Sequence, residues 1–259
     1  MSISTNHDFF IKIVQCRFVP SIQHWRYSHS STPTWRFYWN PTGSANIFSK
    51  GKKIILTGDT AILIPPYTPF STDAENPFSH FFIHFTWESD FEPVKREIQI
   101  FSKKELISDN ISSNLDNLSE RQLEHASSAI AHTALFLLPD SFFVRKNDHE
   151  KTLFERALKV IDQDPAFPAS CEKLAKICGT SVNTLSRHFR KATGLPFKIW
   201  LIHRKMEKAA HLLRNQGCSI KETADLLGFA DRYHFSKVFK KYFGTTPAQF
   251  KQAGEMPLP

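Results

Sequence analysis

An internal repeat in the C-terminal part of this 259-residue chain constrains its fold more than any other feature. Ala175 and Gly179 recur 49 residues later, and residues 185–194 recur 50 residues later as residues 235–244. Each copy contains a short helical segment, a glycine that marks a tight turn, and a second helical segment that ends at another glycine. The sequence therefore predicts two helix-turn-helix motifs in one all-α domain.

The second helix of each copy has a polar outer face. In the first copy, Leu185 and Phe189 lie four residues apart and are expected to face the core, and two phenylalanines do the same in the second copy. The outer positions are Asn183, Ser186, Arg187 and Arg190 in the first copy, and Arg232, Tyr233, Ser236, Lys237 and Lys240 in the second. Asparagine, arginine and lysine donate hydrogen bonds to base edges and phosphates, so these faces predict recognition helices for the major groove of DNA. A helical repeat whose exterior is merely basic is the alternative.

The distribution of charge also points to a polyanionic partner. The chain carries a net charge of +8, but residues 1–149 hold 14 Lys and Arg against 15 Asp and Glu, whereas residues 150–259 hold 19 against 10. A near-neutral first part joined to a basic second part favours nucleic acid over a membrane surface as the partner of the second part. A solvated basic surface is the alternative.

The segment between the two copies is expected to form one continuous helix. Apolar residues recur there at helical steps: Ile199, Ile202, Met206, Ala209 and Leu213. We expect the first motif over 171–194, the linking helix over 196–215 and the second motif over 219–244. Such a helix is about 30 Å long, close to the roughly 34 Å of one duplex turn, so it can hold two motifs in adjacent major grooves.

The N-terminal part has a different periodicity. From Phe9 to Phe85, short apolar or aromatic runs alternate with Pro, Gly, Ser, Asn and Thr, which is typical of strands and turns. The pattern favours an antiparallel, cupin-like jelly-roll barrel over 9–100, followed by helices over 103–138 and a polar linker over 139–148. The predicted fold class is α+β with two domains, 1–148 and 149–259.

A helix over 119–138 is predicted to be amphipathic. Its apolar stripe consists of Leu123, Ala126, Ile130, Ala134 and Leu137. The stripe could pack on the barrel of its own chain, or it could meet the same stripe of a second chain as an antiparallel pair. We expect a homodimer that forms through this stripe, with packing on the chain's own core as the alternative.

Two aromatic segments are candidates for a ligand site. Trp35, Phe37 and Trp39 alternate along one predicted strand, and His80, Phe82 and His84 alternate along another. Aromatic rings can stack on the C–H faces of a sugar while imidazoles bond its hydroxyls. We therefore expect Trp35, Trp39, His80, Phe82 and His84 to line a small-molecule site. Aromatic side chains that only fill the barrel are the alternative.

The C-terminal repeat resembles the DNA-binding domain of the AraC/XylS family over about 100 residues. The resemblance is most specific in the second copy, in Ile220, Ala224, Gly228, Phe229, Phe235, Phe239, Lys240, Phe243, Gly244, Pro247 and Phe250. It implies that bases are read by Asn183, Ser186 and Arg187 in the first copy, and by Arg232, Tyr233, His234 and Lys237 in the second. It also implies phosphate contacts by Arg190 and Lys240.

The N-terminal part is similar to the sugar-binding jelly-roll of the same family, through Thr57-Gly58-Asp59, residues 61–66 and residues 80–85. It departs from the family at Phe70, where a histidine is common, and at Phe82, which stands in place of an indole. The resemblance implies a transcription regulator that senses a small molecule, with a carbohydrate expected. Its implied partners are promoter DNA, this effector and RNA polymerase.

Enzymatic chemistry finds little support in the sequence. Twelve histidines raise the alternative of a metal-dependent cupin-type enzyme fused to a DNA-binding domain, but no His-x-His pair occurs, and His80 and His84 are four residues apart. Phosphate-loop, nucleophile-elbow and zincin motifs are absent from the sequence. We expect no enzyme activity, no metal and no cofactor.

The cysteines and the lack of long apolar runs indicate the cellular compartment in which the protein is expected. Cys16, Cys171, Cys178 and Cys218 form no Cys-x-x-Cys pair and are expected to be reduced thiols, with a methyl-accepting cysteine as a remote alternative. No run approaches the ~18–20 apolar residues of a membrane span, and no secretory signal begins the sequence. We expect a cytoplasmic protein without a membrane partner.

Overall fold

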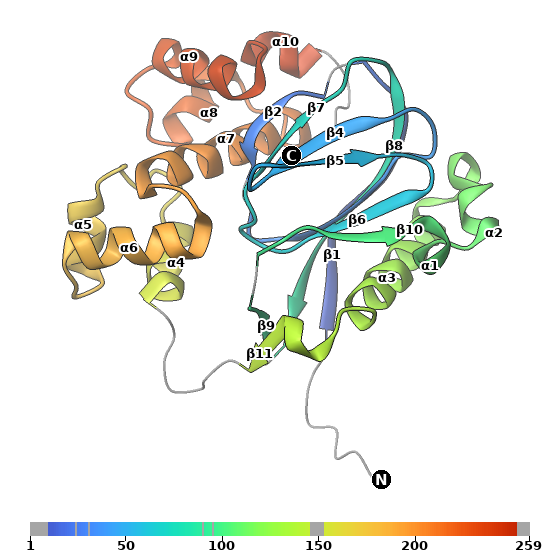
Figure 1. Ribbon diagram of the computed structural model, residues 1–259. Coiled ribbons are helices and arrows are strands. Elements are labelled where there is room, and N and C mark those ends of the chain that lie inside the picture. Colours follow the sequence, from blue (N-terminus) through green and yellow to red (C-terminus); the bar gives the residue numbers. More distant parts are fainter. Residues whose placement is uncertain are drawn as a thin grey trace. The chain divides into compact units, whose positions relative to one another are not determined.

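The computed structural model describes residues 10–23, 25–30, 32–89, 91–94, 96–145 and 153–252. The chain divides into two compact units. The first comprises Met1–Trp25, Thr32–Thr68 and Thr72–Lys146, and the second comprises Arg26–Ser31, Pro69–Ser71 and Asn147–Pro259. The first unit is dominated by antiparallel strands and the second by helices, so the predicted α+β fold class is confirmed (Figure 1). The linker predicted over 139–148 is wrong in its described part, because residues 140–145 form a 3-10 helix and a strand and Phe142 lies in the core of the first unit; residues 146–148 lie outside the described residues.

Eleven strands are found in the described residues, and they form three sheets. The largest has the order β1(Phe10–Ile22), β8(Phe78–Glu88), β3(Trp35–Trp39), β6(Thr60–Ile64) and β10(Gln99–Ser102). The second has the order β2(Tyr27–Ser30), β7(Phe70–Asp73), β4(Ala45–Ser49) and β5(Lys52–Leu56). β9(Phe91–Pro93) and β11(Phe143–Arg145) form the third. Neighbours in the largest sheet pair antiparallel, as expected of a jelly-roll.

One face of the largest sheet packs on helices. The short helical segments are α1(Lys103–Leu106), α2(Asp109–Ser112), η1(Leu115–Asn117) and η2(Asp140–Phe142). The longer helix α3(Glu120–Phe136) begins at a capping box in which Ser119 and Gln122 exchange hydrogen bonds, and it lies against β1. Phe37, Phe81, Ile130 and Ala134 meet in the apolar core between the sheet and α3.

This packing corrects the expectation that the apolar stripe of α3 is free to form the subunit interface. Ile130 and Ala134 are buried in the core of their own unit, and Leu123 packs against that core. Ala126 is half-buried, and Leu137 remains exposed. The stripe faces inward because the sheet supplies an apolar surface within the same chain, which is the alternative that the periodicity left open.

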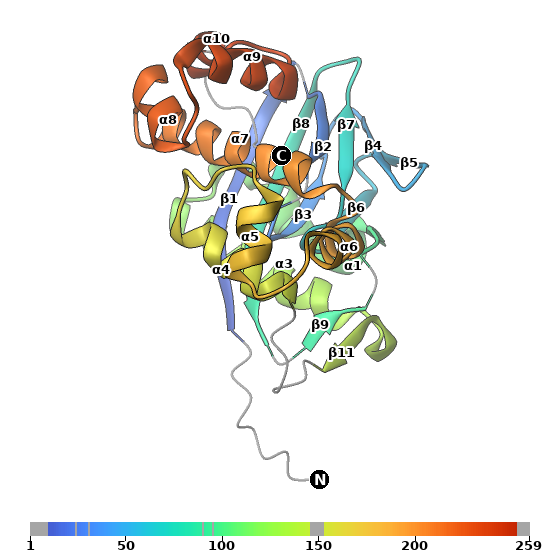
Figure 2. The ribbon, with the colours of Figure 1, turned by 90° about the vertical axis from the view of Figure 1, so that its left-hand side faces the viewer.

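The second unit contains seven helices within the described residues. They are α4(Leu153–Gln163), α5(Cys171–Ile177), α6(Val182–Thr193), α7(Phe197–Asn215), α8(Ile220–Leu226), α9(Arg232–Phe243) and α10(Pro247–Gln252). The long helix α7 connects a group formed by α4, α5 and α6 to a group formed by α8, α9 and α10 (Figures 1 and 2). None of the helices that the structure describes is long and apolar enough to cross a membrane.

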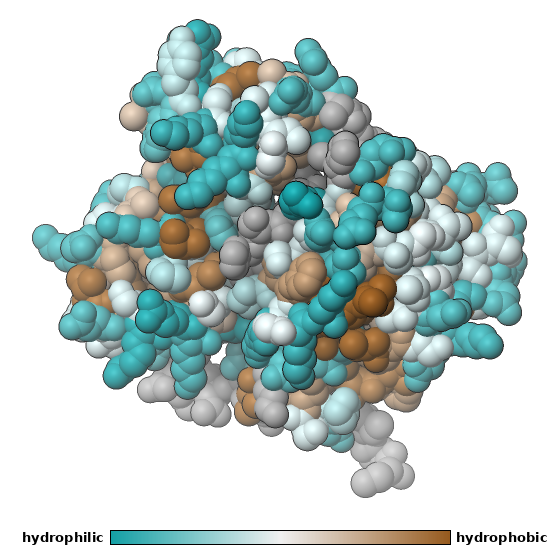
Figure 3. Space-filling model, turned by 45° about the horizontal axis from the view of Figure 1, so that its top comes forward, coloured by the Kyte–Doolittle hydropathy of each residue, from teal (hydrophilic) through white to brown (hydrophobic). Residues whose placement is uncertain are grey.

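The two motifs are built by equivalent local signals. Ser181 caps α6 and Asp231 caps α9, and both helices end at glycines in the left-handed conformation. Leu185 and Phe189 of α6 are fully buried, as are Phe235 and Phe239 of α9. Cys171 and Cys178 are buried free thiols. On the face shown in Figure 3, hydrophobic residues form small groups between hydrophilic ones.

Candidate nucleic-acid interface and buried polar cluster

The structure places the predicted readers of the first motif on the solvent side of α6. Asn183, Arg187 and Arg190 are exposed, whereas Ser186 is half-buried. The Oγ of Ser186 lies 3.4 Å from the Sγ of Cys171 on α5, so this hydroxyl also joins the two helices of the motif. The outer face of α6 therefore offers an amide and two guanidinium groups to a ligand.

The equivalent face of α9 carries more charge. Arg232, Tyr233, His234, Lys237 and Lys240 are all exposed, and Tyr233 has 72% of its surface accessible. Ser236 is half-buried, and its hydroxyl donates to the Arg232 carbonyl oxygen. It therefore helps to hold the helix backbone rather than projecting freely.

The first turn of α9 is ordered by its own side chains. Asp231 accepts hydrogen bonds at 2.7 Å from the backbone nitrogens of Tyr233 and His234, and the bond from His234 is the main cause that lowers the pKa of Asp231. The Arg232 guanidinium donates to the Tyr233 hydroxyl at 2.9 Å and lies 4.9 Å from the ring centroid. Two large side chains at the start of α9 are thus held together before any ligand is bound.

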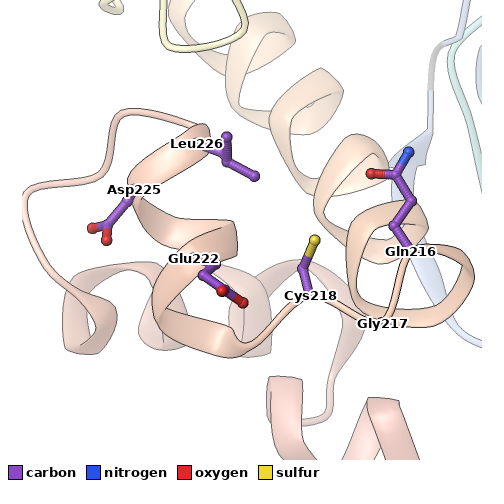
Figure 4. Close-up of a pocket in the computed structure, with 6 residues that line it drawn as sticks. All are labelled: Gln216, Gly217, Cys218, Glu222, Asp225 and Leu226. Atoms are coloured by element: carbon purple, nitrogen blue, oxygen red, sulfur yellow. The ribbon is translucent and has the colours of Figure 1, made fainter.

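A surface pocket lies at the turn between α7 and α8 (Figure 4). It has a volume of about 670 Å³ and is lined by Gln216, Gly217, Cys218, Glu222, Asp225 and Leu226. None of the predicted DNA-reading residues lines it. Its two carboxylates, at Glu222 and Asp225, disfavour the phosphates of DNA, so this pocket does not belong to the candidate interface.

A separate polar cluster is buried in the first unit. His80 and His84 project from β8 on the face that also carries Tyr38 of β3, because β-sheet register pairs Tyr38 with Phe82 and Arg36 with His84. The Nδ1 atom of His80 lies 2.7 Å from Oδ1 of Asn40, and the Nε2 atom of His84 lies 3.3 Å from the Tyr38 hydroxyl. The cluster combines aromatic surface with several hydrogen-bonding groups.

Several polar atoms of this cluster have no hydrogen-bond partner among the described residues. These atoms are Nε2 of His80, Nδ2 of Asn40 and Nε1 of Trp25, and their side chains are at most 1% exposed. The ring of Trp25 lies 4.8 Å from that of His80. Buried polar atoms are normally paired, so an unpaired group of this kind indicates a place for a polar ligand or for ordered water.

Burial also fixes the charge of the two histidines. It lowers the pKa of His80 to about 3. It lowers the pKa of His84 well below the usual value as well, and electrostatic interactions with Arg36 and His80 act in the same direction. Both rings are therefore neutral near pH 7, and each can offer one donor and one acceptor nitrogen.

The two tryptophans that were predicted to line the ligand site do not belong to the polar cluster. Trp35 and Trp39 pair with Phe85 and Phe81, and these side chains point to the opposite face of the sheet, toward α3. The Nε1 atom of Trp39 donates to the Gly58 carbonyl oxygen at 2.7 Å. The expectation that these tryptophans line one site together with His80 and His84 is wrong, because the two sets lie on opposite faces of the sheet.

Sequence reasoning missed Trp25, Tyr38 and Asn40 as members of the cluster. Tyr38 could have been found from the strand alternation, since it lies between the two tryptophans and must face away from them. Asn40 and Trp25 lie beyond strand ends and gave no periodic signal. Within the described residues, no three His, Cys, Asp or Glu side chains come together in a way that could hold a metal ion.

The arrangement of the second unit defines a class of protein: two capped helix-turn-helix motifs with basic outer faces, joined by one long helix, make a DNA-binding transcriptional regulator. A family described as "Helix-turn-helix domain" matches residues 174–253. This matched domain is of the AraC type, and the relatives to which the chain is similar are regulators of the AraC/XylS family.

Individual relatives agree with this assignment. The Msm operon regulatory protein of Streptococcus mutans is 24% identical over 76% of this chain and 76% of its own length. The transcriptional activator RhaS of Escherichia fergusonii is 24% identical over 66% of this chain, and that match spans 59% of RhaS. The structure of ToxT from Vibrio cholerae with a bound unsaturated fatty acid has a TM-score of 0.67 at 14% identity and covers 97% of both chains. At that identity, the likeness to ToxT shows the fold alone.

Proposed function

We propose that this protein is an effector-responsive regulator whose first unit binds a small polar molecule and whose second unit reads promoter DNA through α6 and α9. The observation that carries the proposal is the pair of equivalent, exposed and basic helix faces in one domain. Each helix begins at an N-cap residue, and a pair of buried apolar residues on its inner side anchors it in the core.

In this proposal, the bases are read by Asn183, Ser186, Arg187, Arg232, Tyr233, His234 and Lys237. Arg190 and Lys240, which lie nearer the C-terminal ends of their helices, contact phosphates. Arginine and asparagine can each bond two acceptor or donor atoms of one base edge, whereas a lysine on a phosphate carries no sequence information. The roles are tested by selecting bound sequences from a random duplex library, with the wild type and with single alanine variants of these residues.

The effector site that we propose is the buried polar cluster, with His80, Phe82 and His84 at its centre. An acceptor at His80 Nε2 and donors at Asn40 Nδ2 and Trp25 Nε1 are complementary to a hydroxyl group, which both donates and accepts. Aromatic rings on the same face suit the C–H surfaces of a saccharide. A neutral, hydroxylated ligand fits this lining better than a hydrocarbon chain does.

Calorimetric titration of the full chain with mono- and disaccharides tests the effector site. The panel includes an unsaturated fatty acid, because ToxT was solved with one bound. We expect heat from at least one sugar, loss of that heat in His80→Ala, and retention of it in Trp39→Phe, which alters the opposite face of the sheet. The absence of heat from every sugar would remove the carbohydrate from the proposal.

We further propose that the protein acts as a homodimer and that it influences RNA polymerase at the promoter. The exposed side of α3 supports a dimer, because Phe136 and Leu137 present apolar surface to solvent there. Transcription in a purified system, with and without this protein, tests the action on RNA polymerase.

The enzyme alternative has a direct test of its own. Stoichiometric iron, manganese or zinc in the purified protein would favour a metal-dependent enzyme over a sensor domain.

A further inference from the structure

A buried lysine connects the linking helix to the turn of the second motif. Lys205 lies in the middle of α7 and is 9% exposed. Its Nζ atom donates to the carbonyl oxygen of Leu227 at 2.6 Å, and Leu227 is the C-cap residue of α8. The ammonium group also lies 5.7 Å from the ring centroid of Phe229. Lys205 thus binds the backbone of Leu227, directly before Gly228, and contacts the ring of Phe229, directly after it.

The same place is reached by the loop that joins α4 to α5. Gly228 has a φ of +67°, and a Cβ atom at this position would lie 2.7 Å from the carbonyl oxygen of Ala166. The backbone nitrogen of Ala166 donates to the Asp164 carboxylate at 3.0 Å, so the loop is held in its own conformation. The carboxylate of Asp164 also opposes the effect of burial, which lowers the pKa of Lys205.

Three segments therefore converge around Lys205. The loop at Asp164 leads from α4 into α5, the first helix of the first motif, and Asp162 of α4 is also ion-paired with Arg204 of α7. The turn at Gly228 belongs to the second motif and determines the direction in which α9 leaves α8. The contacts of this buried ammonium group therefore add to the direct packing of α8, α9 and α10 on α7 in placing α9 relative to α6.

We propose that Lys205 is a positioning residue that fixes the second recognition helix relative to the first, and so sets the spacing of the two half-sites that the protein accepts. This inference rests on the proposed reading of DNA by both helices. Lys205 itself lies on the inside of the domain and is not among the residues proposed to contact bases. Its effect arises because a bound duplex requires both helices to be in place at the same time.

The test compares whole operators with half-operators. An operator selected from a random library by the wild-type protein is divided into its two halves and is also remade with one base pair added or removed between them. Lys205→Met keeps most of the apolar stem but leaves the Leu227 carbonyl without its donor. We expect it to weaken binding to the whole operator by about tenfold or more, a loss typical of a hydrogen bond from a charged donor.

The same variant should bind each isolated half as the wild type does, and it should discriminate less between the respaced operators. Lys205→Arg restores a charged donor and should recover part of the lost affinity. Lys208→Met makes the same chemical change at an exposed position of α7 and should leave the preference for spacing unchanged. Thermal unfolding of each variant shows whether the domain is still folded.

Two results would overturn the inference. One is an equal loss on whole and half operators, which would make Lys205 a general stabiliser of the domain, and the other is no loss at all. If the wild type itself selects no sequence, then the proposed reading of DNA fails, and this outcome is distinct from either of the two.

Discussion

The Nδ1 atom of His80 lies 2.7 Å from the amide oxygen of Asn40, and both side chains are completely buried. An amide oxygen only accepts, so Nδ1 carries the proton and Nε2 is left as a buried acceptor. This one bond fixes the tautomer of the ring and aims its free nitrogen within the polar cluster. The same burial makes the stability of the first unit depend on pH.

We predict that the full chain loses stability as the pH falls from about 7.5 to about 5. The pKa of His80 is about 3 in the folded protein and near 6.5 in the unfolded chain, so in this range only the unfolded chain takes up the proton. The contribution of His80 is about 2 kcal/mol over that interval. Urea unfolding at both pH values measures it.

The matched variants are His80→Gln and His125→Gln. The first removes the buried titrating group and should reduce the stability difference between the two pH values by about 2 kcal/mol. The second replaces an exposed histidine of α3 and should leave that difference as it is. Equal pH dependence in His80→Gln and the wild type would contradict the assignment.

The variants Arg187→Ala and Lys240→Ala should change DNA binding in different ways. Removal of a base-reading arginine costs about 1–3 kcal/mol at one position of the site and relaxes the preference there. Removal of a phosphate-contacting lysine weakens binding to all sequences alike and reduces its salt dependence. Affinities for a full set of operator variants at two salt concentrations separate the two effects. An unchanged base preference in Arg187→Ala would remove this residue from the readers.

Substitutions on the exposed side and on the buried side of α3 should have different effects. Phe136 is 83% exposed, so Phe136→Glu should keep the fold and shift a dimer toward monomer. Ile130 is buried in the core, so Ile130→Glu should cost on the order of 3–5 kcal/mol in folding stability. Sedimentation and thermal unfolding measure the two results. A wild type that is monomeric at high protein concentration would exclude the dimer.

Two glycines of the second motif should respond differently to alanine. Gly244 has a φ of +77° with no atom near its missing Cβ, so Gly244→Ala should cost about 1 kcal/mol from backbone strain alone. Gly228 adds a close contact with Ala166, so Gly228→Ala should cost more. Chemical unfolding provides both values, and equal costs would argue against the close approach of the α4–α5 loop.

Periodicity in the sequence predicts the helices of the second unit better than it predicts the faces of the strands. The helices α6 and α9 could be anticipated because their apolar pairs occur twice, at equivalent places in a repeat. The strand Trp35–Trp39 is buried on both faces, so alternation alone could not show which of its residues face α3 and which face the polar cluster. The contact between Lys205 and Leu227 joins residues 22 apart through a turn, and no local pattern encodes it.

Both α6 and α9 are proposed to read DNA. The most direct test is the selection of duplexes from a random library by the wild type, by an Asn183→Ala, Arg187→Ala double variant and by an Arg232→Ala, Lys237→Ala double variant. We expect the wild type to select two half-sites whose centres lie about 10 base pairs apart, and each double variant to lose sequence preference in one half only. Selection of no sequence by the wild type, or of one short site that neither double variant alters, would contradict the claim.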